Sequence, residues 1–140
     1  MSNGTASNQV DDAELLARFM TKKDWVRSDG TVKQDAFVPP RDLHFSVTRH
    51  GSLAENEIWE IGQGVADQIS RRPRTPFYGR ADLRASAVTQ IQPLRVVPFP
   101  LAENPNHAHI DGWPLDKSDQ KRLAQDLAAA AGKVIVRPSK

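Results

Sequence analysis

The feature that most constrains the fold is the order of two residue patterns along the chain. Two long segments, 52–69 and 116–131, repeat apolar residues at the spacing of amphipathic helices. Short stretches of strand character precede, separate and follow them. Because strands and helices do not alternate regularly, this order favours an α+β fold with a mainly antiparallel sheet over a doubly wound one. We expect both principal helices to pack on one face of that sheet.

The clearest strand covers residues 43–50, where Leu43, Phe45 and Val47 alternate with His44, Ser46, Thr48 and His50. Gly51 follows, and Ser52 with Glu55 matches the capping box that opens a helix. In that helix the spacing predicts a buried stripe of Ile58, Ile61, Val65 and Ile69. Asp29-Gly30 predicts a hairpin turn. Further strands are expected at 77–82, 94–100, 107–113 and 134–137, with a short helix at 85–90; residues 14–20 fit a strand or a helical turn.

A chain of 140 residues is long enough for one domain with a real core. We assign residues 13–140 to a single α+β domain, and residues 1–12, which are polar, to a disordered segment. The absence of cysteine excludes disulfides and thiolate metal sites, and it fits a reducing compartment. No apolar run is long enough to span a membrane, and the N-terminus has no signal-peptide pattern. We therefore expect a cytoplasmic bacterial protein.

All four histidines fall on the polar sides of predicted strands. If those strands are neighbours, one face of the sheet gathers imidazoles, hydroxyls and a guanidinium: His44, Ser46, Thr48, His50, Tyr78, Arg80, His107, His109 and Asp111. Such a face suits a phosphate ester or a nucleotide, because arginine binds an anion with two hydrogen bonds and a neutral histidine acts as a base. The candidate ligand-binding residues are Arg49, His50, Tyr78, Arg80, His107 and His109, and the candidates for catalysis are His107, His50, Arg49 and Arg80.

A metal site is a weaker alternative, with His107, His109 and Asp111 as its candidate ligands. A His-x-His pattern is short and common, and no spaced partner accompanies it. We therefore predict neither a metal nor a cofactor. Nucleic acid is not favoured either, because 19 Lys and Arg residues face 17 acidic ones and few aromatic residues are available for base stacking.

Several short motifs together resemble a family of small bacterial proteins without an assigned activity. They are "DLHFSVTR", "IWEIG", "GRAD" and "GWPLDKSDQK", in this order within residues 15–131. The resemblance implies no catalytic residue. We predict an accessory protein that is not an enzyme and binds another protein through the polar sheet face or the Gly-Trp-Pro turn. In that turn Trp113 is an anchor if it is exposed and a packing residue under the last helix if it is buried. A protein that binds or acts on a phosphate-bearing ligand is the alternative.

Overall fold

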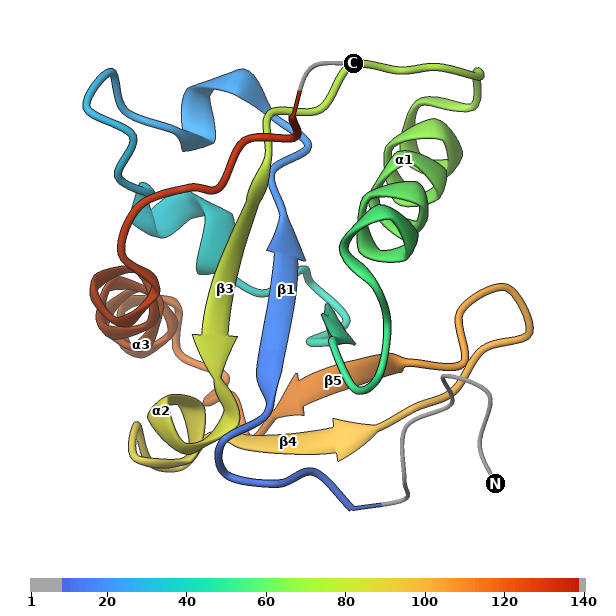
Figure 1. Cartoon of the computed structure of the whole chain (residues 1–140). Coiled ribbons are helices and arrows are strands. Elements are labelled where there is room, and N and C mark those ends of the chain that lie inside the picture. The colour runs from blue at the N-terminus through green and yellow to red at the C-terminus, as the bar shows by residue number, and fades with distance from the viewer. Residues whose placement is uncertain (1–8, 139–140) are drawn as a thin grey trace.

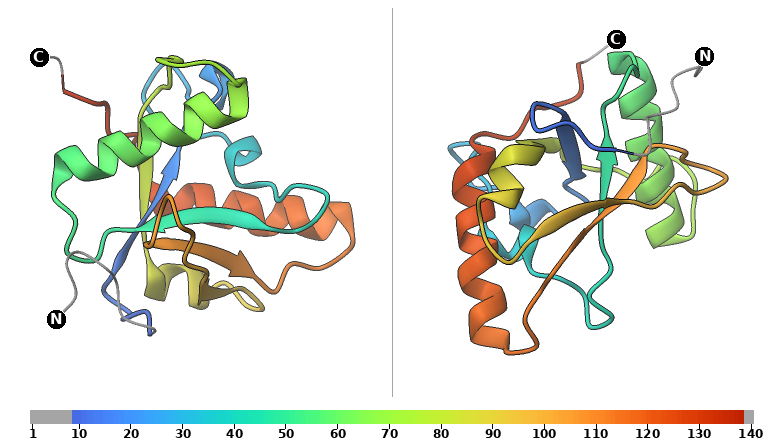
Figure 2. Two further views of the ribbon diagram at one scale, coloured as in Figure 1. Left: turned by 90° about the vertical axis from the view of Figure 1, so that its right-hand side faces the viewer. Right: turned by 90° about the horizontal axis from the view of Figure 1, so that it is seen from below.

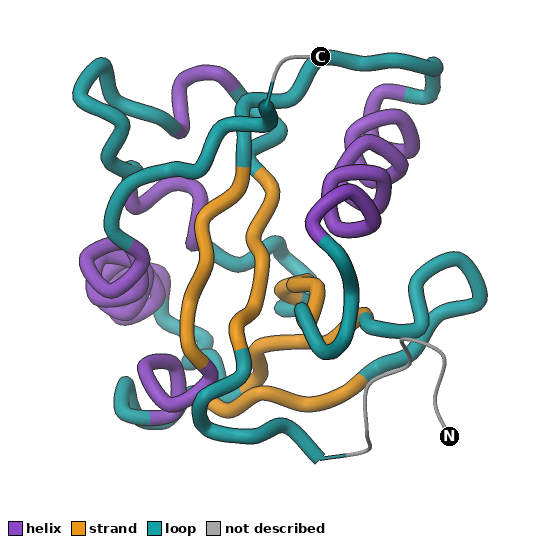
Figure 3. Tube along the Cα trace, viewed as in Figure 1, coloured by secondary structure: helices purple, strands orange, loops and turns teal. Residues whose placement is uncertain are grey.

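A computed structural model describes residues 9–138 and confirms the predicted α+β fold, with an antiparallel five-stranded sheet. The strands are β1 (Leu15–Phe19), β2 (Phe45–Arg49), β3 (Arg80–Arg84), β4 (Arg95–Pro98) and β5 (His107–Asp111). Their order in the sheet is β3-β1-β2-β5-β4, and β1 and β3 cross β4 and β5 at a large angle (Figure 1). β1 and β2 are joined by a long segment of loops with two short 3-10 helices, η1 (Lys23–Trp25) and η2 (Gln34–Phe37) (Figure 3).

The α-helices of the described chain are α1 (Glu55–Ser70), α2 (Ala85–Thr89) and α3 (Lys117–Ala131). α3 begins as predicted after Asp116, whose carboxylate accepts a hydrogen bond from the Asp119 amide at 3.0 Å. The capping box predicted for α1 is wrong by two residues. The Ala54 amide donates to Glu57 Oε1 at 2.8 Å, and alanine has no side-chain oxygen to complete the reciprocal bond.

The two principal helices pack on opposite faces of the sheet, so the expectation that they share one face is wrong (Figure 2). β1 explains the difference. Its Leu16 and the following Met20 face the core beneath α3, whereas Ala17 and Phe19 face α1. A strand buried on both sides has no polar alternation, and this is why residues 14–20 could not be assigned from their pattern.

The larger core lies between the sheet and α3, and its biggest fully buried side chains include Phe37, Phe45, Leu16, Met20, Leu83, Ile110 and Leu127. The smaller core joins α1 to β1. Gly62 permits this contact, because a Cβ there would lie 2.7 Å from ring carbons of Phe19. The stripe predicted for α1 is correct at Ile58, Ile61 and Val65, which pack against the smaller core, but Ile69 is 66% exposed. Trp59, at the start of the helix, is buried as well.

Of three shorter predicted elements, one is confirmed and two change. The Asp29-Gly30 turn is confirmed, since Gly30 has a φ of +87° between the bridged residues Val26 and Val32. The predicted strand 77–82 begins later, at Arg80. Residues 134–137 form no strand. Instead, Ile135 exchanges both backbone hydrogen bonds with Arg80, each at 2.9 Å, along the outer edge of β3.

The predicted disordered segment, residues 1–12, lies outside the described residues up to residue 8. Residues 9–12 contact the domain: the Gln9 carbonyl accepts from Arg49, and the Asp12 carbonyl accepts from the Ser86 amide at 2.9 Å. None of the helices within residues 9–138 combines the length and the apolar character that a membrane crossing requires.

Candidate functional site

The polar sides of β2 and β5 coincide, as the alternation predicted. The two strands are antiparallel neighbours in which Ser46 lies opposite His109 and Thr48 lies opposite His107. In an antiparallel pair, opposed residues project from the same face. His44, two residues before Ser46, extends this row, and its ring stacks on that of His109 with centroids 5.2 Å apart.

Three imidazoles and one phenyl ring meet on this face, and we call Phe99, His44, His107 and His109 the ring cluster. The Phe99 and His109 rings stack with centroids 4.4 Å apart, and His107 meets His109 edge to face at 4.9 Å. The Phe99 carbonyl lies 2.9 Å from His107 Nδ1, so that nitrogen donates its proton and Nε2 is the acceptor of the neutral ring. Phe99 is 48% exposed and His44 is also exposed, whereas His109 is buried. The ring cluster is therefore an accessible edge around one buried imidazole.

The pKa of His109 lies below its ordinary value. Burial is the main cause, and the nearby His107 and His44 lower the pKa further against the opposing effect of Asp111. The folded protein therefore favours the neutral His109 ring, so its contribution to stability is complete above the unfolded pKa of about 6.5 and is lost as the pH falls.

This sign gives a prediction. Between about pH 8 and about pH 5, His109→Gln is expected to make the free energy of unfolding less dependent on pH than in the wild type. Urea unfolding at several pH values measures this dependence. His44→Gln removes an exposed imidazole from the same cluster. In this variant the free energy of unfolding should keep most of its wild-type dependence on pH. An unchanged slope in His109→Gln would contradict the buried neutral ring.

The weak metal candidates are not arranged as ligands. Within residues 9–138 there is no group of three or more His, Asp or Glu side chains that could hold a metal ion. His107 and His109 meet edge to face, and Asp111 lies further along β5, opposite Arg95 of β4.

Arg49 does not belong to this face, so the predicted pairing of Arg49 with the histidines is wrong. It lies two positions beyond Val47 on the core side of β2, is 3% exposed, and binds both carboxylate oxygens of Glu14 at 2.9 Å. Its guanidinium therefore ties the segment before β1 to β2. The strand pattern placed Arg49 beside His50 in sequence, but neighbours in a strand project from opposite faces.

Arg80 and His50 lie together, but in an ion network under α1 that also contains Glu55 and Asp82. Arg80 is 3% exposed and donates to both oxygens of Glu55, at 2.9 and 3.0 Å, and to Asp82 at 3.1 Å. His50 Nε2 lies 3.1 Å from the same Asp82. The Arg80 guanidinium also lies 4.7 Å from the centre of the Trp59 ring. This arginine is thus neutralised by the chain's own carboxylates.

The pKa values in the ion network show how strongly its charges are held. Burial alone would raise the pKa of Asp82, yet hydrogen bonds from His50 and Arg80 leave it below its ordinary value. Burial likewise works against the charged form of Arg80, but its hydrogen bonds to Glu55 and Asp82 raise its pKa. Arg80 and its two carboxylate partners are therefore charged at neutral pH, and they tie the first turn of α1 to β3.

Tyr78 lies apart from both groups. It lines an open hollow of about 440 Å³ with Lys23, Phe77, Val136 and Arg137. The six predicted ligand-binding residues therefore divide among four places: His107 and His109 in the ring cluster, His50 and Arg80 in the ion network, Arg49 in the core-side pair, and Tyr78 in this hollow. β1 separates β3 from β2, so a common polar pattern did not imply a common pocket.

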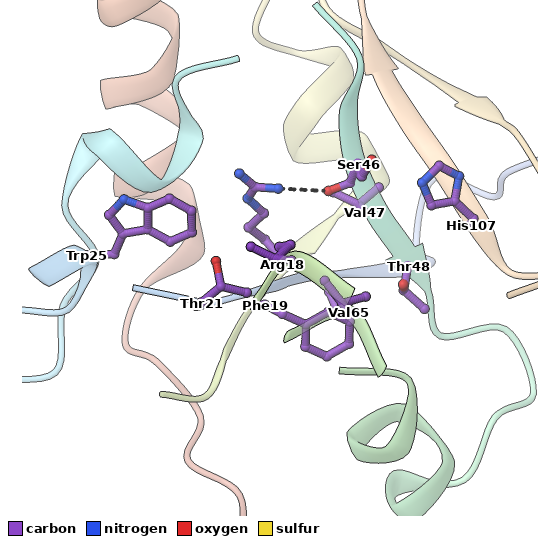
Figure 4. A pocket seen from close by; sticks show the side chains of 11 residues that line it. Arg18, Phe19, Thr21, Trp25, Ser46, Val47, Thr48, Val65 and His107 are labelled. Atoms are coloured by element: carbon purple, nitrogen blue, oxygen red, sulfur yellow. Dashed lines mark hydrogen bonds between the residues drawn. The ribbon is translucent and has the colours of Figure 1, made fainter. Parts of the chain in front are cut away.

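A cavity of about 110 Å³ between β1 and β2 was not anticipated from the sequence (Figure 4). It is lined by residues 17–19 of β1, by Ser46, Val47 and Thr48 of β2, by Val65 and Ile69 of α1, and by Thr21, Trp25 and His107. Arg18 extends from β1 into the space between Trp25 and Ser46 (Figure 4). The one feature of the sequence that could have indicated this cavity is a single arginine, Arg18, inside the apolar run "LLARFM".

Trp113 is 7% exposed, packs against Phe45, and donates its indole N–H to the Ile110 carbonyl at 2.9 Å. It therefore belongs to the core, and the Gly-Trp-Pro turn offers no tryptophan anchor to a partner. Comparison of the chain with protein-family models, with curated proteins and with solved structures finds no match. The resemblance to the family of small bacterial proteins stays a prediction.

Proposed function

We propose that this chain is a binding protein without catalytic activity, and that its ring cluster contacts another protein. The observation that carries the proposal is the stacking of planar rings in an exposed position on the polar face of the sheet. Phe99 is half exposed and stands between Pro98 and Pro100, which restrict its backbone. A rigid, accessible aromatic side chain loses little conformational entropy on binding and is a frequent anchor of protein interfaces.

The chemistry of the ring cluster favours a partner that presents a planar side chain, above all an aromatic one. The depressed pKa of His109 favours the neutral form of this buried ring, and a neutral ring accepts edge-to-face or offset stacking from another ring. Ser46 and His44 are exposed beside the stack and supply hydrogen-bonding groups at its rim. The proposal includes a cytoplasmic location, which the absence of cysteine supports.

The proposal is tested by crosslinking followed by a direct affinity measurement. A photo-crosslinking phenylalanine analogue at position 99 should capture a partner in cells that produce the chain, and the same analogue at position 115 should not. Leu115 is 86% exposed, lies just before α3 and is not part of the ring cluster, so it controls for indiscriminate capture.

The captured protein is then purified and titrated calorimetrically against the wild type and two variants. Phe99→Ser is expected to weaken binding by about tenfold or more, as truncation of an interface anchor does, while Leu115→Ser leaves it unchanged. Equal affinity of wild type and Phe99→Ser for every captured protein would refute the proposed binding surface. Circular dichroism and thermal unfolding establish that both variants fold.

A further inference from the structure

The cavity between β1 and β2 exists because these strands pair over only two positions. Leu16 lies opposite Arg49 and Ala17 lies opposite Thr48, and continuation of this register would bring Arg18 opposite Val47. The pairing ends before that point, whereas β1 remains paired with β3 as far as Phe19. The two strands therefore diverge and leave a wedge-shaped gap between them, which is the cavity, and the Arg18 side chain lies where the gap opens (Figure 4).

Arg18 fills part of the wedge without a carboxylate partner. Its Nε donates to the Ala36 carbonyl at 2.9 Å, and one terminal nitrogen donates to the Ser46 carbonyl at 3.2 Å. A guanidinium has five N–H donors, so these two bonds leave three for a bound anion or for solvent. The guanidinium carbon lies 4.1 Å from the centre of the Phe45 ring and 5.3 Å from that of Trp25, which hold its plane in position.

The other arginines inside or against the fold are neutralised. Arg49, Arg80 and Arg137 each form an ion pair with a glutamate, and none of the ion pairs of residues 9–138 includes Arg18. Burial lowers the pKa of Arg18 to about 10, so the side chain is still charged at neutral pH while its hydration is reduced. A charge held in this way attracts an anion more strongly than an exposed arginine does.

Residues with hydroxyl groups also line the cavity, but they lie on both sides of the sheet. The side chains of Ser46 and Thr48 project from the face of β2 opposite to Phe45, over which the Arg18 guanidinium lies. Thr21 lies beside Arg18 (Figure 4), so its hydroxyl can donate to the same anion as the guanidinium.

We propose that the cavity between β1 and β2 binds a phosphate group, with Arg18 as its charge partner and the Thr21 hydroxyl as a further donor. A volume of about 110 Å³ accommodates an oxyanion but not a whole nucleotide, whose pockets are typically several hundred Å³. The phosphate is therefore either inorganic phosphate or the terminal group of a larger molecule that remains outside the wedge. This site does not depend on the proposed binding of a protein by the ring cluster.

The test is a titration of the ¹⁵N-labelled chain with inorganic phosphate, glycerol phosphate and acetate at constant ionic strength, followed by NMR. Inorganic phosphate is expected to shift the Arg18 Nε–H and the Ser46 and Thr48 amide signals along a saturable curve, with a dissociation constant of the order of 1 mM. Acetate should bind about tenfold more weakly, since it offers fewer acceptor oxygens. Saturation by glycerol phosphate at the same signals assigns the phosphate to a larger molecule, and its absence assigns it to the free ion.

Substitutions separate this site from general attraction of anions. Arg18→Gln should weaken phosphate binding by about tenfold or more, and Thr21→Val should weaken it severalfold. Arg122→Gln removes the same charge from the exposed side of α3 and should change the affinity less than twofold, as should Phe99→Ser in the ring cluster. If Arg18→Gln does not fold, Thr21→Val carries the comparison. Non-saturable shifts, or equal affinities of the wild type and all cavity variants, would overturn the proposal.

Discussion

Replacement of Arg80 by methionine is expected to lower the free energy of unfolding by about 3–5 kcal/mol, because it removes one of the two side chains that hydrogen-bond the largely buried Asp82 carboxylate. Arg80 is 3% exposed, and methionine fills a similar volume without the two ion pairs. Urea unfolding at neutral pH measures the loss. Glu55→Gln is the matched control: this partner is 67% exposed, so its removal should cost less than about 1 kcal/mol.

A second measurement shows whether the uncompensated charge is the cause. The double variant Arg80→Met/Asp82→Asn should recover part of the stability lost by Arg80→Met alone, because it no longer buries an isolated carboxylate. In the wild type, the lowered pKa of Asp82 makes its contribution complete above the unfolded carboxyl pKa and lost as the pH falls below it. The variants without Asp82 or Arg80 should therefore unfold with a weaker dependence on acid. A loss under about 1 kcal/mol in Arg80→Met would show that the network does not hold α1 on the sheet.

The second large effect is expected at the contact between α1 and β1. Gly62→Ala should destabilise the protein by about 1–3 kcal/mol, because its new methyl group would overlap the Phe19 ring in a packed core. The overlap is specific, since the added Cβ would lie 2.7 Å from two ring carbons of Phe19 and 3.1 Å from one of Phe77. Thermal and urea unfolding measure the difference from the wild type.

Gly64, two positions further along the same helix, is the control for Gly62. A Cβ at Gly64 meets no atom within 4 Å, so Gly64→Ala should raise stability by up to about 1 kcal/mol through helix propensity alone. Opposite signs for the two substitutions would locate the close approach at Gly62. A gain in both would mean that α1 can move away from Phe19 at no cost.

Much of the sheet could be predicted because its pattern is local. The alternation of Phe45 and Val47 with Ser46 and Thr48 fixed which side of β2 is polar, and the same argument placed His107 and His109 on one side of β5. That these two strands are neighbours was only an assumption at that stage, and the register confirms it. The Asp29-Gly30 turn and the α3 cap were likewise readable from residues a few positions apart.

What could not be predicted depends on contacts between distant residues. The sequence made Arg49 a candidate ligand, but in the structure its guanidinium binds Glu14, which is 35 positions away along the chain. Arg80 is likewise neutralised by Glu55, at a separation of 25 positions. Arg18 was overlooked for the complementary reason. Its apolar neighbours indicate a buried strand, but only the early end of the pairing between β1 and β2 gives this charged side chain a space to occupy.

The pairing of Ile135 with Arg80 has a consequence for how the chain can be handled. β3 is an outer strand, and Ile135 pairs with Arg80 at its edge, where Gly79 leaves room for the Ile135 carbonyl. Shortening the chain from this end would uncover the Arg80 amide and carbonyl and lengthen the unpaired edge, which is a template for intermolecular β-sheet growth. Purification tags and truncations are therefore better placed at the other terminus.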